Sequence, residues 1–473
     1  MTKNLAPADM LFLLAERENA SMSPGGLHIF QIPKGAARDF VANYVAQLRN
    51  IPPRSPFNQT LNLRGGRPRM ETTEVDMHRH VQHVKLPRPG NRQQLIKAVE
   101  QAGEPLLDRK YPLWKCTVFE GLQGRRFALL ITMHHALSDG QGGLDTFHSL
   151  VSHEPGEPLR AFWGDNKKNA KAKKKSASAR PPSSNLRKIT NLLSPANQLK
   201  AAKVILSQST GLAQDVIDIV AGEGDNLAQL RWFKGERSRF NMLAESSKRT
   251  FGYCDLPLGK VRRLGKQYNC TVNDVLLCLA DAASNRYLSD HGEISHKPQV
   301  AIMPISTRVE GDETMSNNVT VTTLSLGQPD ADITDRMKQI RTSTTRFKQL
   351  YAKHNKLTTL NTAMEGLATL LRSTIPGKPP NSVLGNMGFS NISPPKNSDT
   401  VSHAYYAGDA KLMGIYCQPI LGGAVGLNIT VLTYNKKIRI GVGGSPEALP
   451  DADLFARYMY DALLELESAT AAK

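Results

Sequence analysis

Two adjacent histidines, His134 and His135, follow the apolar run RFALLITM at 126–133 and precede a stretch that contains Asp139 and Gly140. An imidazole with a pKa near neutrality can accept the proton of an alcohol while the hydroxyl oxygen attacks a carbonyl, which accelerates acyl transfer by about 10²- to 10⁴-fold. If the strand continues through the pair, the two side chains point to opposite faces, so one is expected to be chemical and the other structural. Asp139 can orient an imidazole, or pair with an arginine and hold the loop in shape.

The sequence offers no covalent nucleophile by motif, since it lacks a G-x-S-x-G elbow and its five cysteines stand in no catalytic signature. Direct transfer from an activated acyl donor is therefore favoured over an acyl-enzyme. No metal site is predicted, because two adjacent histidines and one aspartate lack a clear third ligand. One alternative stays open at this point: the histidines can simply end a buried strand, with the glycines turning the chain.

The elements that must position this chemistry follow from the apolar patterns. The runs at 113–120 and 126–133 flank a turn-rich segment and predict a hairpin whose second strand is buried. Apolar residues at helical spacing predict a helix at 271–288, with Thr271 or Asn273 capping its start. Strands and helices interleave in both halves, so the fold class is α/β or α+β with mixed sheets. The other predicted elements are strands at 299–306 and 319–326, a hairpin at 427–444 and an amphipathic helix at 451–468.

Length and charge suggest how the chain is divided. A chain of 473 residues allows two or three domains, and its 60 Lys and Arg residues exceed its 42 Asp and Glu residues by 18, which favours an anionic partner. Half of this excess falls in 166–190, which holds nine Lys or Arg residues and no acidic residue. This segment is either a solvated loop or an arm that docks on anionic lipid. We predict an N-terminal domain at 1–165, a basic linker with connecting helices at 166–245 and a C-terminal domain at 246–473.

Cysteine usage and hydropathy indicate the compartment. Five scattered cysteines without a C-x-x-C pair predict neither a disulfide framework nor a zinc site, and they are typical of a reducing compartment. The N-terminal apolar stretch is too short for a signal peptide, and there is no run of about 18 apolar residues. We expect a cytoplasmic protein whose association with any membrane is peripheral.

The segment MHHALSDG at 133–140 reproduces the HHxxxDG motif of the CoA-dependent acyltransferase superfamily. Beyond that motif, nearly the whole chain resembles the bacterial wax ester synthase/acyl-CoA:diacylglycerol acyltransferase family. The family's usual Ser-Asn-Val-Pro-Gly-Pro lacks its glycine here. The matching segments follow the family's order: PADMLFLLAE (7–16), PLWKCTVFEGL (112–122), TVNDVLLCLADAA (271–283), MPISTR (303–308), MSNNVT (315–320), SNISPP (390–395) and LNITVLTYNKKIRIGV (427–442).

The resemblance implies an α/β fold with mixed sheets and helices, built as two chloramphenicol acetyltransferase-like domains with an interdomain active-site channel. It identifies His135 as the general base that deprotonates the acceptor hydroxyl. His134 and Asp139 are then structural, and Gly140 allows a close turn.

Two further family motifs fall on this chain. The Asn-Asp motif matches Asn273 and Asp274, for which the resemblance implies a supporting role, with helix capping as an equal alternative. The Pro-Leu-Trp motif matches 112–114, which the residues themselves predict to be the start of a strand packed in the core.

The resemblance also implies a reaction: transfer of a long-chain acyl group from acyl-CoA to a fatty alcohol, giving a wax ester, or to diacylglycerol, giving triacylglycerol. Acyl-CoA is then a co-substrate, and neither a bound cofactor nor a metal is expected. A basic protein suits the phosphates of the donor, and apolar products suit an enzyme at the surface of a membrane or lipid inclusion.

Three alternatives remain. A condensation-type domain shares HHxxxDG but takes a carrier-bound thioester as donor. The spacing from His134 to Asp139, H-x-x-x-x-D, is that of glycerol-phosphate-type acyltransferases. Nucleic-acid binding is permitted by the net charge, but half of that charge lies in one low-complexity segment and only 6% of residues are aromatic, so it is disfavoured.

Overall fold

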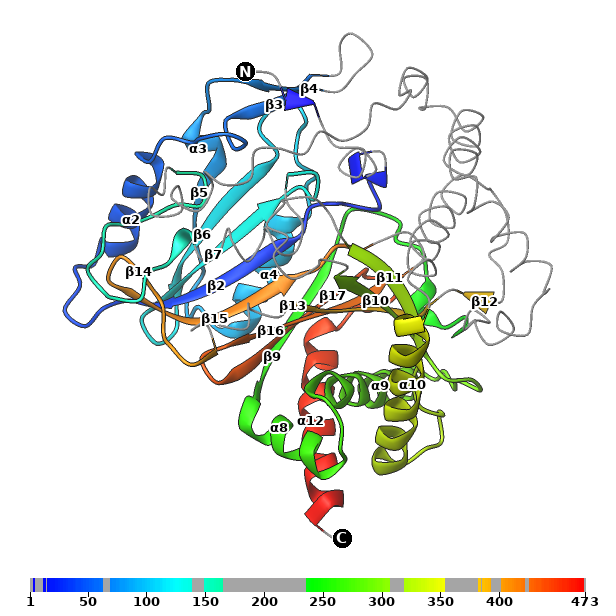
Figure 1. Cartoon of the computed structure of the whole chain (residues 1–473). Coiled ribbons are helices and arrows are strands. Elements are labelled where there is room, and N and C mark those ends of the chain that lie inside the picture. The colour runs from blue at the N-terminus through cyan, green and yellow to red at the C-terminus, as the bar shows by residue number, and fades with distance from the viewer. Residues whose placement is uncertain are drawn as a thin grey trace.

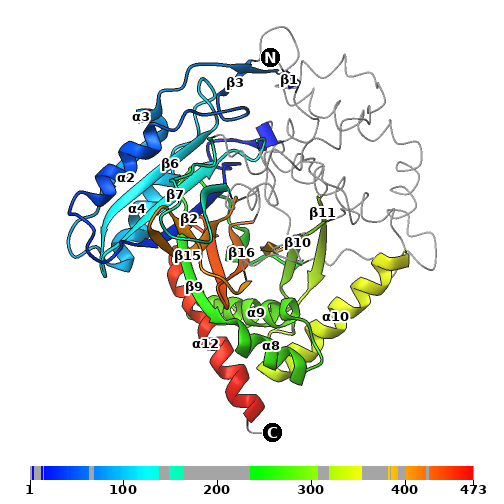
Figure 2. The same ribbon diagram turned by 60° about the vertical axis from the view of Figure 1, so that its left-hand side comes forward.

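The computed structural model describes residues 3–4, 12–13, 15–62, 69–137, 149–164, 235–306, 319–353, 382–383, 385–392, 401–421 and 425–471. The predicted site residues Asp139 and Gly140, together with the basic segment 166–190, lie outside these described residues. Within these described residues, two six-stranded sheets form the framework. Figures 1 and 2 show the arrangement of the elements from two directions.

The first large sheet has the strand order β14-β15-β2-β7-β6-β5. β5 runs parallel to β6, and the other neighbours are antiparallel. β6 and β7 form the predicted hairpin, with Trp114 opposite Met133. We call this sheet and its helices the first lobe. Its strands are β2 (Gly25–Gln31), β5 (Val81–Lys85), β6 (Trp114–Leu122), β7 (Arg126–Met133), β14 (Tyr406–Ala407) and β15 (Ala410–Gln418).

Strand β7 is apolar almost throughout because both of its faces are covered. Phe127 and Leu129 pack in one core with helix α2 (Phe40–Arg49), whereas Ala128 and Leu130 pack in another with helix α4 (Arg92–Gly103). Alternate residues of one strand thus belong to two separate cores. The predicted buried central strand is confirmed.

The second large sheet has the strand order β11-β10-β13-β16-β17-β9. β13 is parallel to both of its neighbours, and the remaining pairs are antiparallel. The predicted hairpin at 427–444 is confirmed, and its turn places Asn435 and Lys436 at positive φ. Its strands are β9 (Thr250–Pro257), β10 (Val300–Ser306), β11 (Val319–Ser325), β13 (Met387–Ile392), β16 (Leu427–Tyr434) and β17 (Lys437–Gly444).

Among the described residues, four helices pack against this second sheet and complete what we call the second lobe (Figure 1). Helix α9 is the predicted helix at 271–288, and it begins with a capping box in which Thr271 and Asp274 exchange hydrogen bonds. None of the helices in the described part of the chain has both the length and the apolar character needed to cross a membrane. The four are α8 (Leu258–Gln267), α9 (Val272–Asp290), α10 (Ile333–Lys353) and α12 (Ala452–Ala471).

The remaining elements are short. They are β1 (Lys3–Asn4), β3 (Gln59–Asn62) and β4 (Arg69–Thr72), which form a three-stranded sheet, the pair β8 (Gly235–Glu236) and β12 (Ser382–Val383), helix α3 (Met77–His80) and the 3₁₀ turn η4 (Arg239–Asn241).

Two strands of the first lobe, β14 and β15, come from the C-terminal part of the chain. β15 pairs antiparallel with β2, with Gln418 opposite Gly25, and it lies beside β2 in Figure 1. The backbone of Cys417 also lies against Gly441 of β17, where a Cβ would be 1.9 Å from the Cys417 carbonyl oxygen. β15 therefore joins the two lobes. The domain boundaries at 165 and 246 stay a prediction. They did not anticipate that β15, which belongs to the predicted C-terminal domain, is a strand of the first sheet.

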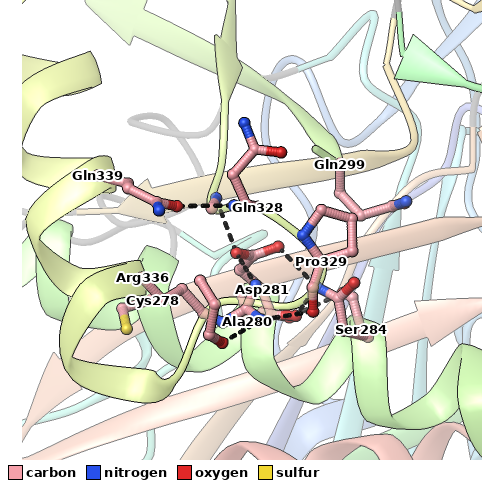
Figure 3. Close-up of polar contacts among 12 residues, drawn as sticks. Cys278, Ala280, Asp281, Ser284, Gln299, Gln328, Pro329, Arg336 and Gln339 are labelled. Atoms are coloured by element: carbon pink, nitrogen blue, oxygen red, sulfur yellow. Dashed lines mark hydrogen bonds and ion pairs between the residues drawn. The ribbon is translucent and has the colours of Figure 1, made fainter. Parts of the chain in front are cut away.

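Helices α9 and α10 are joined by a buried ion pair, which Figure 3 shows in close-up. Nη1 of Arg336 lies 2.6 Å from Oδ2 of Asp281, and the two side chains are 5% and 0% exposed. The Asp281 carboxylate also accepts from the amide of Gly327 at 2.8 Å and from the side chain of Asn285 at 3.1 Å. Nη2 of Arg336 donates to the carbonyls of Pro329 and Ala331, so the pair also fixes the entry to α10.

Candidate active site

The histidine pair stands immediately after β7, which ends at Met133. The two backbone amides donate to different neighbours: His134 to the carbonyl of Leu113 at 2.9 Å, and His135 to the carbonyl of Met22 at 2.8 Å. The amide of Leu137 then donates to the carbonyl of His134 at 2.9 Å, which closes a tight turn. The pair is thus held by hydrogen bonds that its backbone amides donate to two other segments of the chain.

His134 is fully buried, and contacts engage both of its ring nitrogens. The amide N–H of Ala136 donates to Nδ1 at 3.0 Å, so the ring hydrogen resides on Nε2. Nε2 lies 3.4 Å from Oε1 of Glu16. This arrangement leaves His134 no free lone pair with which to take a proton from a substrate.

His135 has different surroundings. Its side chain is partly buried, and its ring stacks on Phe12 with centroids 4.2 Å apart and 11° between the planes. Stacking covers a face of the imidazole and leaves the ring edge, which carries the nitrogens, at the side of the stack. Of the two histidines, only His135 has a side chain that is partly exposed.

Glu16 is a buried carboxylate that the sequence analysis did not single out; its side chain is 2% exposed. Oε1 accepts from the amide of Met22 at 3.2 Å, and Oε2 lies 3.3 Å from Nη2 of Arg109. Burial alone would raise the pKa of Glu16, but His134, the Met22 amide and Arg109 together hold it below its usual value. The only sequence signal was its place as the one acidic residue ending the apolar segment at 10–16.

The second lobe reaches this region through Arg249, which is 5% exposed and directly precedes β9. Its Nη1 donates to the carbonyl of Ser23 at 3.2 Å, next to the Met22 that binds His135. Burial lowers the pKa of Arg249 to about 10, and the charge of Glu16 opposes that shift. The histidine pair therefore lies close to the junction of the two lobes.

The structure places the other predicted residues as follows. Trp114 opens β6 at 1% exposure and donates from Nε1 to the carbonyl of Phe57 at 2.8 Å, which confirms core packing of the Pro-Leu-Trp motif. Asp274 belongs to the capping box of α9, whose N-cap is Thr271. Asn273 instead accepts from the side chain of Asn391 at 3.3 Å, so the Asn-Asp motif and the segment at 390–392 meet in the second lobe.

Comparison with known proteins decides the family. Residues 5–276 match the family model of the wax ester synthase/diacylglycerol acyltransferase catalytic domain, and residues 315–467 match that of the WS/DGAT C-terminal domain. The chain belongs to this family. The resemblance that the motifs indicated is confirmed, and this WS/DGAT family member is an acyltransferase.

Relatives match along nearly the whole WS/DGAT chain. It is 30% identical over 449 residues to the O-acyltransferase WSD of Acinetobacter baylyi, covering 94% of this chain and 93% of the relative. It is 31% identical over 466 residues to a Mycobacterium tuberculosis protein that bears the name "Probable diacyglycerol O-acyltransferase Tgs4", covering 98% of this chain and 96% of the relative.

Solved structures confirm the predicted fold class, a mixed α/β architecture of two acetyltransferase-like lobes. The wax ester synthase/diacylglycerol acyltransferase from Marinobacter aquaeolei VT8 matches with a TM-score of 0.75 at 25% identity, over 99% of this chain and 100% of that one. The first condensation domain of the calcium-dependent antibiotic synthetase matches with a TM-score of 0.57 at 14% identity, over 100% and 96%. The latter likeness concerns the fold alone.

Proposed function

We propose that this WS/DGAT member transfers a long-chain acyl group from acyl-CoA to a fatty alcohol or to diacylglycerol, with His135 as the general base. The observation that carries the assignment is the contrast within the histidine pair. Both nitrogens of His134 are engaged inside the protein, whereas His135 is partly exposed and held in place through its backbone and its stacked ring.

The proposed step is a direct transfer. A ring nitrogen of His135 takes the hydroxyl proton of the acceptor as its oxygen bonds to the thioester carbonyl carbon. The C–S bond then breaks, the imidazolium returns the proton to the leaving thiolate, and the products are the ester and free CoA. The reaction is proposed to take place in a channel between the lobes, which the position of Arg249 beside Ser23 supports.

A two-acceptor assay tests this function. Purified protein is incubated with palmitoyl-CoA and either hexadecanol or diacylglycerol, and both thiol release and the lipid product are followed. We expect thiol release that depends on the acceptor and matches ester formation one for one. Activity only with lysophosphatidate, or only with a carrier-bound thioester, would instead favour the glycerol-phosphate-type or condensation-type alternative.

We also propose that the enzyme is cytoplasmic and works peripherally at an anionic membrane or lipid-inclusion surface. The nine Lys and Arg residues of 166–190 support this, since each basic residue near such a surface contributes about 1 kcal/mol at low salt.

A vesicle experiment checks the lipid-surface proposal. A variant whose nine basic residues at 166–190 are replaced by Gln should sediment much less with vesicles of anionic phospholipid in low salt, and the difference should shrink as salt screens the charges. Neutral phosphatidylcholine vesicles are the control. Equal partitioning of both proteins on anionic vesicles at low salt would refute a lipid-binding role for this segment.

A further inference from the structure

The side chain of Glu16 is tied to the histidine pair by two connections, and the segment that carries Glu16 adds two more. The first runs through Met22, whose amide donates to Oε1 of Glu16 at 3.2 Å while its carbonyl accepts from the amide of His135 at 2.8 Å. A single residue therefore joins the carboxylate to the backbone of the proposed base. Displacing the carboxylate would release Met22 and, with it, the main-chain anchor of His135.

The second connection is through the ring of His134. Oε1 of Glu16 lies 3.4 Å from Nε2, and on the opposite side of the ring Nδ1 accepts from the amide of Ala136. The carboxylate thus orients a ring that in turn holds the turn immediately after His135. Without the carboxylate, the Nε2 of this fully buried imidazole would lose its 3.4 Å contact with Oε1.

The third and fourth connections belong to the segment that carries Glu16. Its own amide donates to the carbonyl of Phe12 at 3.1 Å, and Phe12 is the ring that stacks on His135. Leu13 packs in a small apolar cluster with Leu113, whose carbonyl accepts from the His134 amide, and with Ala136, which follows His135. The ring stack and the hydrogen bonds thus converge on one short segment.

The carboxylate is itself firmly held. Nη2 of Arg109 lies 3.3 Å from Oε2 and also donates to the carbonyl of Leu13 at 2.7 Å, so one guanidinium binds both the side chain and the backbone of the segment. Arg249 adds a second buried positive charge from the other lobe. A buried carboxylate surrounded by two arginines and two hydrogen-bond donors stays ionised and has little freedom to move.

We propose that Glu16 is a positioning residue for the acyl transfer: its side chain sets the orientation of His135 through Met22 and His134. Its negative charge also stabilises the protonated imidazole that forms in the reaction. This inference rests on the proposed role of His135 and adds a residue that acts through it.

The test compares Glu16→Ala and Glu16→Gln with the wild type in the palmitoyl-CoA and hexadecanol assay. Glu16→Ala should lower kcat by about 10²-fold with little change in either KM, since small misplacements of a catalytic group have effects of that size. Glu16→Gln keeps an oxygen that can accept from Met22 and His134, so it should recover most of that loss. Glu18→Ala, an exposed glutamate two residues away, is the matched control and should match the wild type.

The pH profile separates positioning from general damage. Removing a nearby negative charge lowers the pKa of an imidazole, so in Glu16→Gln the acid limb of kcat/KM should move to lower pH. The inference would be overturned if the acid limb did not shift while both variants lost the same amount of kcat and had a lowered Tm. Wild-type kcat in Glu16→Ala would also overturn it. If Glu16→Ala does not fold, the Gln variant and its pH limb decide the question.

His135→Ala is measured in the same assay. If this variant is fully active, the proposed function of His135 fails. If it is inactive and the Glu16 variants have normal activity, only the inference about Glu16 is overturned.

Discussion

His135→Ala is expected to lower kcat by about 10²- to 10⁴-fold while the protein keeps its Tm, because the substitution removes the proposed proton acceptor and little else. The side chain is partly exposed, and its backbone hydrogen bond to Met22 does not depend on the imidazole. The acid limb of the pH profile of kcat/KM should be absent in this variant, because the variant lacks the imidazole. Steady-state kinetics of purified protein, with Tm measured on the same preparation, check both expectations.

Two other histidines serve as comparisons for this variant. His78 of α3 is exposed, so His78→Ala should be kinetically silent. His134→Ala empties a fully buried site and leaves Glu16 and the Ala136 amide without their partner, so it should lower Tm along with activity. Wild-type kcat in His135→Ala would dismiss the general-base assignment, whatever the family.

Asp281→Ala is expected to lower the free energy of unfolding by about 3–5 kcal/mol, because it leaves Arg336 as a buried charge without a counter-ion. The Gly327 amide and the Asn285 side chain lose an acceptor as well. Chemical unfolding followed by circular dichroism measures the loss. The matched control is Asp461→Ala, whose pair with Arg286 is about half exposed and should contribute at most about 1 kcal/mol.

The same pair makes stability depend on pH. Burial raises the pKa of Asp281 to about 6 against the pull of Arg336 and of the Gly327 amide. Since the folded pKa exceeds that of the unfolded chain, the stability contributed by this group is full below about pH 4 and is lost as the pH rises through about 6. Arg336→Leu removes the pull, so its unfolding free energy should fall more steeply than that of the wild type between about pH 5 and pH 8. Asp281→Ala should lack this slope; an identical slope in all three proteins would contradict the assignment.

The sequence predicted those strands, helices and turns that depend on residues close together in the chain. The run at 126–133 is apolar on both faces, which indicated a central strand, and β7 is covered by α2 and α4. The helix at 271–288 has its capping residues within one turn, and it begins at Val272 as the Thr271 cap requires. The turn at 435–436 joins two apolar runs directly, and β16 pairs with β17.

The features that were missed depend on distant partners. The sequence analysis did not predict β15, and nothing near 410–418 indicates that it pairs with β2. Glu16 looks like a surface acid in the sequence, since it is followed by Arg17 and Glu18. The buried carboxylate of Glu16 is paired with Arg109 and His134, and only the tertiary fold brings these two residues next to it. Asp139 and Gly140 keep the roles that the resemblance implied, as predictions, because both lie outside the described residues.

The pairing of β15 with β2 has a consequence for how the protein is made. Until residues 410–418 have left the ribosome, β2 has no neighbour on one side, and the first sheet presents an open hydrogen-bonding edge. The N-terminal half, which carries the histidine pair, therefore cannot complete its own sheet while the rest is being synthesised. A fragment that stops before residue 401 should aggregate, and supplying the missing strand as a separate C-terminal fragment should restore solubility.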